Sequence, residues 1–380
     1  MRYSKLCYVS TIAWPLRVYI GPHIDEVAKN NYVMLIADGV EELRCKFSPS
    51  IMLKNIEIKR KVSIYYDCLA FFRLYFAFKR NKFDCVHSIM PKAGLLSMVA
   101  AKLAGVPVRI HTFTGQIWQT RTGLSRLLFK LLDRLLAKCA TSLLTDSKSQ
   151  MEFLVNSGIV GSDKIKVLNH GSIAGVNLVK FSKNSDDRVE SRKRMGISLN
   201  DVLYLYVGRF NYEKGVSELL LAFKELALKN SDVRLLMIGS DESDYSKQIS
   251  RYPYFLRNRI TIIDFTYEPE EYMCAADILC LPSHREGFGN VILEAAALGI
   301  PAIASKISGL EDSVVDGITG ILHRPGNVGS LLNAMELLLK NKELRIYLGL
   351  NAGRRVKSEF DQRALISQHI NYYQSFGLVV

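Results

Sequence analysis

Short apolar runs alternate along this chain with longer segments in which apolar residues recur at helical spacing. Runs of a few apolar residues that end at Gly, Asp or Ser favour strands buried on both faces. Regular alternation of strands and helices indicates an α/β fold with a parallel sheet covered on both sides. The predicted strands cover residues 5–11, 32–38, 85–89, 108–113, 142–147, 165–171, 202–208, 234–240, 260–265, 278–283 and 301–305.

The length and the strand pattern both indicate two domains. A chain of 380 residues exceeds the roughly 250–300 residues at which a single core stops growing. A polar stretch, residues 182–201, separates two series of predicted strands, so we expect it to connect the domains. The predicted first domain is 1–181 and the second is 202–362, each Rossmann-like, with a ligand cleft between them.

Apolar runs and cysteines indicate where the protein works. No apolar run reaches the ~18 residues of a membrane-spanning helix. Residues 1–21 resemble a signal peptide, but Pro15 and Arg17 interrupt the apolar stretch, and we expect a strand there. Seven cysteines, without a C-x-x-C pair, argue against a disulfide or zinc framework. We therefore expect a reducing, cytoplasmic location.

The charge is unevenly distributed. The net charge is +13, and residues 51–140 hold 16 Lys and Arg against four acids, whereas residues 201–380 hold 19 against 22. A basic face on one domain attracts polyanions such as nucleic acid, anionic lipid head groups or a phosphorylated acceptor. Charge alone does not choose among these partners.

Two helical segments lie in this basic window. Residues 124–138 place leucines at helical spacing beside Arg126, Lys130, Arg134 and Lys138. A basic amphipathic helix of this kind can lie on a membrane or pack on a sheet with its basic face in solvent. We expect the second arrangement, and we also expect the aromatic residues of 71–83 to face a core.

The segment 278–299 carries the most specific pattern. It predicts a strand, a turn with Gly287 and Gly289, and a helix that ends at Gly299. Glu286 and Glu294 would lie ~12 Å apart along a helix axis, which is too far for a hydrolase carboxylate pair. Between them, a bared helix N-terminus favours an anion such as phosphate.

This order of carboxylate, anion site and carboxylate fits a nucleotide diphosphate sugar. Glu294 would accept hydrogen bonds from the ribose diol, and Glu286 from the sugar hydroxyls. Alternatively, Glu286 is only an acid near a helix N-terminus and Glu294 a surface residue. A second pattern favours the nucleotide-sugar interpretation, because Arg209 and Lys214 lie on a loop after the predicted strand 202–208. Two cations there would bind a diphosphate leaving group.

The combination of "GRFNYEKG" (208–215) and "EGFGNVILEA" (286–295) resembles the family 4 retaining glycosyltransferases of the GT-B fold. The resemblance covers nearly the whole chain. It implies that residues 363–380 form a helix packing back on the first domain. It also implies that Arg209 and Lys214 bind the diphosphate, Glu294 the ribose, and a turn the donor sugar and phosphates. That turn contains Glu286, Gly287, Phe288, Gly289 and Asn290.

The resemblance also implies site residues in the first domain. The family has a histidine after a strand near the donor sugar, which matches His111, and Gly115 and Gln116 would shape a sugar or acceptor pocket. Thr266 lies where relatives often have glycine beside the base. The acidic segment 240–244 suggests a metal site, but this fold needs no metal or other cofactor to hold the diphosphate, so we interpret it as a solvated loop.

These patterns predict a glycosyltransferase that moves a sugar, from a UDP donor, to a lipid-linked glycan during surface polysaccharide assembly. The basic first domain would contact the inner face of an anionic membrane. Three alternatives stay open at this stage. An epimerase would convert the donor without an acceptor, a nucleic-acid-binding protein would use the basic window, and a sensor would bind the donor without turnover.

Overall fold

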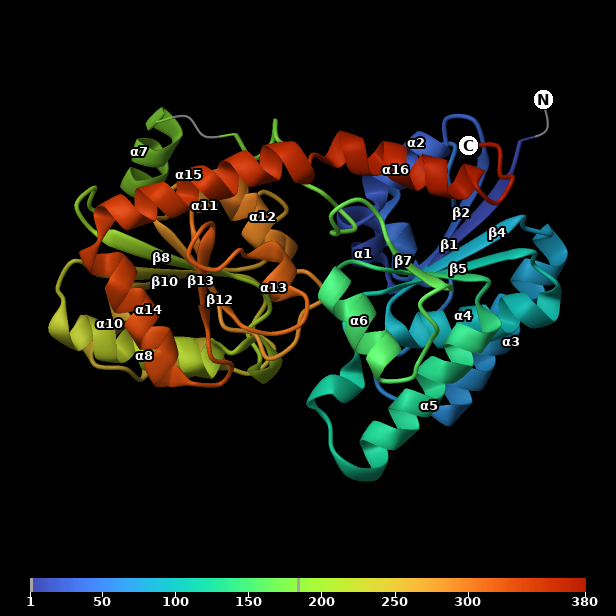
Figure 1. Ribbon diagram of the computed structural model, residues 1–380, viewed down its shortest axis with the longest axis horizontal. Helices are drawn as coiled ribbons and strands as arrows, with labels where there is room; N and C mark the ends of the chain where they lie inside the picture. The colour runs from blue at the N-terminus through green and yellow to red at the C-terminus, as the bar shows by residue number, and fades with distance from the viewer. Residues whose placement is uncertain (1–2, 183–184) are drawn as a thin grey trace. The chain divides into compact units, whose positions relative to one another are not determined.

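The computed structural model describes residues 3–182 and 185–380, which divide into two compact units (Figure 1). The first unit contains the described residues up to Ala174 together with Gln362–Val380, and the second contains Gly175–Asp361. Each unit holds one sheet, and every strand pair in both sheets is parallel. The α/β class predicted from the strand and helix alternation is therefore confirmed.

The first sheet has seven strands, and the strand order reverses beside β1. From one edge to the other they are β3 (Met52–Asn55), β2 (Tyr32–Asp38), β1 (Lys5–Ile12), β4 (Cys85–Ile89), β5 (Val108–Phe113), β6 (Ser142–Thr145) and β7 (Ile165–Val167).

Helices cover both faces of the first sheet. Alternate residues of β1 point to opposite faces, so that Cys7 and Val9 enter one core, which α3, α4 and α5 cover. Leu6 and Tyr8 enter the other core, to which α2 and α16 contribute. The helices of this unit are α1 (Ala13–Val18), α2 (Gly21–Val27), α3 (Ile64–Asn81), α4 (Pro91–Ala104), α5 (Gly123–Cys139), α6 (Lys148–Asn156) and α16 (Gln362–Gln374), with the 3-10 helices η1 (Val40–Lys46) and η2 (Ile117–Thr120).

The second sheet has six strands, and its order reverses between β8 and β11. Ligands of open α/β sheets bind beyond the carboxyl ends of the strands at such a reversal. The strands are β10 (Ile260–Ile263), β9 (Val233–Ile238), β8 (Val202–Val207), β11 (Ile278–Leu281), β12 (Ala302–Ser305) and β13 (Gly320–His323). The loops after β8 and β11 carry the two patterns that the sequence singled out.

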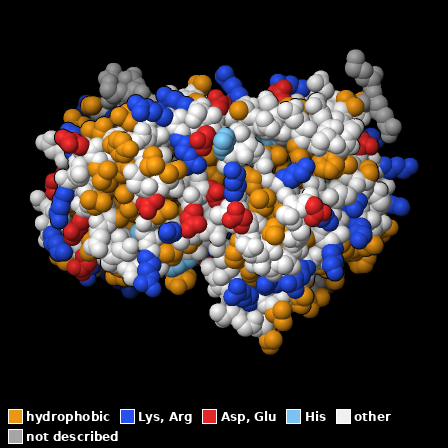
Figure 2. Space-filling view, in the orientation of Figure 1, with side chains coloured by type: hydrophobic (Ala, Val, Ile, Leu, Met, Phe, Trp, Pro, Cys, Tyr) orange, Lys and Arg blue, Asp and Glu red, His pale blue; other side chains and the backbone are white. Residues whose placement is uncertain are grey.

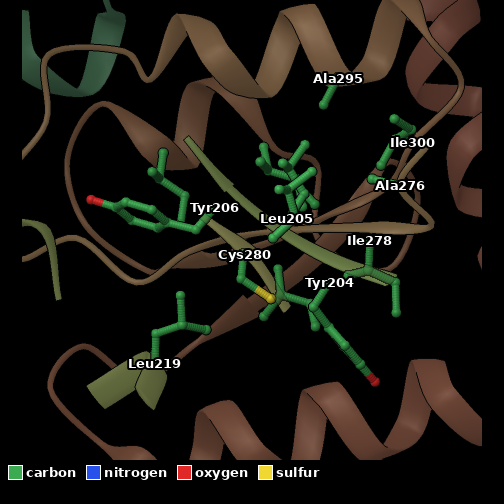
Figure 3. Packing of buried hydrophobic residues seen from close by; sticks show 14 of the residues in the cluster. Tyr204, Leu205, Tyr206, Leu219, Ala276, Ile278, Cys280, Ala295 and Ile300 are labelled. Carbon is green, nitrogen blue, oxygen red and sulfur yellow. The ribbon is translucent and has the colours of Figure 1, made fainter. Parts of the chain in front are cut away.

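One hydrophobic core runs through the second unit. Figure 3 shows Tyr204 and Tyr206 of β8 packed with Ile278 and Cys280 of β11, all buried. The helices are α7 (Ser185–Arg194), α8 (Val216–Lys229), α9 (Tyr245–Ser250), α10 (Tyr254–Arg257), α11 (Glu270–Met273), α12 (Asn290–Ala297), α13 (Leu310–Ser313), α14 (Val328–Lys340) and α15 (Lys342–Glu359), with the 3-10 helix η3 (Tyr212–Lys214).

The segment 182–201, expected as a connection, contributes a packed helix instead. Residues 183 and 184 lie outside the described part of the chain, but α7 follows them within the second unit. Arg192 of α7 is fully buried and donates to Asp277 at 2.6 Å, and Arg188 donates to the same carboxylate at 2.7 Å. The polar composition of 182–201 suggested a linker. The sequence does not show that these arginines have a partner in the fold, because Asp277 lies more than 80 residues away.

Two further observations concern the described helices and the cysteines. No helix within residues 3–182 and 185–380 combines the length and the apolar character needed to cross a membrane. The seven cysteines are free thiols, and five of them are buried.

Replacing Asp277 with Ala should lower the free energy of unfolding by about 3 kcal/mol, because it leaves the buried Arg192 guanidinium without its carboxylate. Urea denaturation checks this value. Asp232→Ala, which removes an exposed carboxylate from the same unit, is the control and should change stability by less than about 0.5 kcal/mol. Equal effects of the two substitutions would contradict the structural role of Asp277.

Candidate active site

The loop after β8 presents the two predicted cations. Asn211 begins the turn η3, because its side-chain oxygen accepts from the Lys214 backbone N–H at 3.1 Å. Gly215 ends it with φ +68°, where a Cβ would lie 2.0 Å from the Pro282 carbonyl oxygen. Only glycine lets the loop approach β11 so closely. The loop therefore places Lys214 beside the turn after β11.

Lys214 meets Glu286 in that turn. The Lys214 ammonium lies 2.5 Å from a Glu286 carboxylate oxygen, which also accepts from the Ser283 hydroxyl at 3.0 Å. The side chains of the pair are 18% and 15% exposed. A partly buried, charge-assisted pair of this kind fixes the geometry of both groups. The structure thus brings together two residues that are 72 positions apart.

Three further contacts join the two loops. The Glu213 carbonyl accepts from the His284 N–H at 2.9 Å. The Glu213 carboxylate pairs with Arg285 at 2.7 Å, and Glu218 contacts His284 at 2.9 Å. These four residues were not predicted as site residues, because nothing in their spacing shows that they face one another. They hold the loop that carries Lys214.

The predicted anion site lies at the start of α12. Gly289 precedes the helix with φ +76°, and a Cβ on Gly309 would lie 2.3 Å from the Gly287 carbonyl oxygen, so the turn packs tightly against a neighbouring loop. Phe288 is buried and its ring contacts Phe360. Only the backbone of Phe288 is therefore placed to contact a ligand, and its side chain serves the core.

Glu294 lies one turn into α12 and is half-buried. Burial raises the pKa of its carboxyl to about 7, with the nearby Lys180 lowering it and Glu270 raising it. Lys180 pairs with Glu270 at 3.3 Å and donates to the Tyr267 carbonyl at 2.7 Å. Lys180 was not predicted, since it lies 114 positions before Glu294. Glu294, Lys180 and Glu270 thus form a polar cluster, in which the Glu294 carboxylate can accept hydrogen bonds from hydroxyl groups.

Arg209 has a partner that the sequence analysis did not predict. Its guanidinium pairs with Glu242 at 2.9 Å, and Asn211 donates to the same carboxylate at 2.9 Å. Residues 240–244 were interpreted as a solvated loop, and residues 241–244 are exposed as expected, but the loop also supplies Glu242 as the partner of Arg209. The acidic residues were seen as a local run, whereas their partners come from the loop after β8.

The remaining predicted residues belong to the first unit. His111 is fully buried in β5, with its Nδ1 2.9 Å from the Ser88 hydroxyl, and burial lowers its pKa to about 3. Its imidazole is therefore neutral near pH 7. Gly115 has φ +102°. The Gln116 side chain is 1% exposed, and within the described chain neither its amide nitrogen nor its amide oxygen has a hydrogen-bond partner. Their catalytic and acceptor roles remain predictions.

Together, the second unit places two cations, a helix N-terminus and two glutamates at the reversal of a parallel sheet. Cations and helix N-termini bind phosphate, and carboxylates accept from sugar hydroxyls. Two parallel α/β units with this donor-type site define a glycosyltransferase of the GT-B class.

Comparisons with known sequences identify the family. The model for glycosyl transferases group 1 matches residues 187–355, and the glycosyl transferase 4-like domain matches residues 41–171. The chain belongs to the family 4 glycosyltransferases. It is 29% identical to the capsular polysaccharide biosynthesis glycosyltransferase CapM of Staphylococcus aureus, over 99% of this chain and 98% of CapM.

A second relative and two solved structures are also similar to this chain. The UDP-Gal:α-D-GlcNAc-diphosphoundecaprenol α-1,3-galactosyltransferase of Escherichia coli is 28% identical over 80% of this chain and 78% of its own. Anabaena HepE in complex with UDP and glucose has a TM-score of 0.81 at 20% identity, covering 98% of this chain and all of HepE. Sucrose-phosphate synthase of Thermosynechococcus elongatus has a TM-score of 0.83 at 20% identity, covering 98% of this chain and 99% of the synthase. The structural likenesses support the fold.

Glu294→Gln should stabilise the protein in a pH-dependent way. Because the folded-state pKa of about 7 lies above the ordinary value of 4.5, the ionised carboxylate costs stability, and this cost grows from about pH 4.5 to 7. At pH 8 the substitution should raise the free energy of unfolding by about 1–3 kcal/mol, allowing for partial exposure. Urea denaturation at pH 8 and pH 5 measures the difference.

The same measurement on Glu225→Gln provides the control, because Glu225 is an exposed glutamate on α8. It should change stability little at either pH. If Glu294→Gln stabilised the protein equally at both pH values, the raised pKa would not be its cause.

Proposed function

We propose that the chain transfers a hexose from a UDP-linked donor to a lipid-linked glycan, with retention at the anomeric carbon, during capsule or O-antigen assembly. The observation that carries this proposal is the joint placement of Arg209, Lys214 and Glu286 with the N-terminus of α12 and Glu294 at the sheet reversal. CapM and the Escherichia coli galactosyltransferase support it by their names, the first for a capsule and the second for a diphosphoundecaprenol acceptor.

The proposed chemistry depends on stabilising the leaving group. As the bond between the anomeric carbon and the β-phosphate oxygen breaks, Arg209, Lys214 and the α12 N-terminus neutralise the charge that develops on the diphosphate. The acceptor hydroxyl attacks the same face of the sugar, and its proton passes to a diphosphate oxygen. Glu286 orients the sugar hydroxyls, and Glu294 orients the ribose.

The same groups favour diphosphate binding without a metal ion or other cofactor. Two cations on one loop and a helix N-terminus supply positive charge from the protein itself. Specificity for the base and the sugar would come from side chains around the ends of the donor, where Thr266 follows β10. We propose that His111, Gly115 and Gln116 serve the sugar and acceptor from the first unit.

Thermal unfolding with UDP, GDP, ADP and UMP tests the donor. One nucleoside diphosphate, which we expect to be UDP, should add about 2.7 kcal/mol of stability at ~100 times its dissociation constant. Glu294→Ala should remove most of this gain, because the ribose diol loses its acceptor, whereas Glu225→Ala should keep it.

If no nucleotide stabilised the parent protein, the proposed donor site would be wrong. Turnover with a UDP-hexose separates the remaining alternatives. A transferase releases UDP only when a lipid-linked acceptor is present, whereas an epimerase converts the sugar without one, and a sensor does neither.

The membrane contact in this proposal comes from the outer surface of α3 and α5. Both helices pack against α4 on one side of the first sheet. The leucines of α5 were expected to pack on the sheet, and this is wrong for most of the helix, since Leu136 is buried but Leu124 is 86% exposed. Also exposed are Leu127, Leu128, Leu131 and Leu135. Helical spacing shows that leucines share a stripe, but not that the stripe faces the core.

The aromatic residues of α3 are divided in the same way. Phe78 is buried as expected, but Phe72 and Phe76 are exposed. Exposed basic residues accompany them, namely Arg73, Lys79, Arg80, Lys82, Lys102, Arg126 and Lys138. Orange and blue side chains alternate along the lower edge of the first unit in Figure 2, where α5 lies.

Exposed leucines next to cations match an anionic bilayer, because the apolar side chains enter the acyl boundary and the cations meet the head groups. We therefore propose that this face binds the cytoplasmic leaflet. A peripheral location would bring the enzyme to an acceptor that is itself a lipid.

The double substitution Leu127→Ser and Leu131→Ser should weaken binding to phosphatidylglycerol vesicles about tenfold or more, because less apolar surface would enter the bilayer. Cosedimentation measures this binding. Leu221→Ser with Leu228→Ser, two exposed leucines of α8, is the matched control and should change nothing. Equal binding of the parent protein to neutral phosphatidylcholine vesicles would contradict the charge match.

A further inference from the structure

The loop after β9 lies directly against the loop after β8. A Cβ on Gly239, which has φ +141°, would lie 2.1 Å from the Gly208 carbonyl oxygen. The Phe210 N–H donates to the Ser240 carbonyl at 2.8 Å, and the Glu242 N–H donates to the Phe210 carbonyl at 3.1 Å. These backbone contacts place Glu242 beside the residues on either side of Phe210, namely Arg209 and Asn211.

The β9 loop is fixed by its own hydrogen bonds as well. The Asp241 carboxylate accepts from the backbone N–H groups of Ser243 at 3.1 Å, Tyr245 at 3.0 Å and Ser246 at 2.7 Å. A carboxylate that accepts three backbone N–H groups holds a loop in one conformation. The position of Glu242 is therefore determined by the backbone on both sides of it.

The Glu242 carboxylate contacts Arg209 in an asymmetric way. Both of its oxygens accept from one guanidinium nitrogen, Nη1, at 3.2 and 2.9 Å, and the second oxygen also accepts from the Asn211 amide at 2.9 Å. Both contacts therefore go to Nη1, and the other edge of the guanidinium is formed by Nε and Nη2. That edge presents two parallel N–H groups, which is the geometry that binds a phosphate.

We propose that Glu242 is a positioning residue for the donor site, which holds Arg209 by Nη1 so that the Nε and Nη2 edge is ready for the donor diphosphate. This inference rests on the proposed function. A long Arg side chain loses rotamer freedom when it binds a ligand, and a residue that fixes it beforehand reduces that cost.

Glu242 also carries a negative charge, which opposes a diphosphate. The side chains of Arg209 and Glu242 are 41% and 33% exposed, so water weakens this repulsion over distance. The hydrogen bond from Asn211 and the backbone hydrogen bonds of the β9 loop keep Glu242 in place. A phosphate at the Nε and Nη2 edge of Arg209 does not require Glu242 to move. We therefore expect positioning to outweigh repulsion.

Titration calorimetry with UDP tests this inference on Glu242→Gln, Arg209→Ala and the double variant. Glu242→Gln should weaken UDP binding about five- to tenfold, because a neutral amide holds the guanidinium poorly. In the Arg209→Ala background the same substitution should have less than a twofold effect, since a positioning residue acts only through the group that it positions.

Asp244→Asn is the matched control, because it removes the same charge from the same loop and Asp244 is paired with Lys247 instead. It should leave UDP affinity within twofold of the parent. This result would separate the positioning of Arg209 from the general effect of removing a negative charge from the loop. Circular dichroism of each variant verifies that it is folded.

Other outcomes overturn the inference. Tighter UDP binding by Glu242→Gln would show that the carboxylate competes with the phosphate. Unchanged binding, in a parent protein that binds UDP and loses it on Arg209→Ala, would refute the role of Glu242 and leave the proposed function intact. A parent protein that binds no UDP would refute the proposed function, and the inference with it.

Discussion

Close backbone approach at three glycines determines the shape of the second unit's site. At Gly215, Gly239 and Gly309, a Cβ would lie within 2.0–2.3 Å of a carbonyl oxygen from a neighbouring loop. All three have positive φ, so a side chain there would suffer both strain and collision. Because the loops after β8, β9, β11 and β12 meet without side chains between them, charged groups distant in sequence reach one another.

Each of the two cations of this site has a carboxylate partner within the protein. Lys214 pairs with Glu286, and Arg209 pairs with Glu242. Balanced charges let a loop carry two cations without mutual repulsion, and they hold each side chain in a defined position. Glu294 differs, because burial raises its pKa and no hydrogen bond or ion pair to its carboxylate occurs in the described chain. It is the group whose hydrogen-bonding capacity is most open to a ligand.

Local patterns predicted the two parallel sheets and the residues that each site loop carries. The run from 278 to 299 specifies strand, turn and helix by itself, so its elements could be placed from sequence. The partners Lys180 and Glu242 could not, since they approach from other loops and no local spacing encodes that contact. Helical periodicity likewise placed the leucines of α5 on one stripe, but only the packing of α5 beside α4 shows that most of that stripe is exposed.

The distribution of charge matches the two tasks proposed for the two units. The excess of positive charge lies in residues 51–140 of the first unit, and residues 201–380 carry slightly more acids than bases. A site that bound its ligand through net charge alone would accept any polyanion. In the second unit, specificity for the proposed diphosphate would instead have to come from the placement of a few paired cations. For the membrane contact proposed for the first unit, non-specific attraction would be an advantage, because a lipid surface is recognised by charge and apolar contact rather than by an exact arrangement of groups.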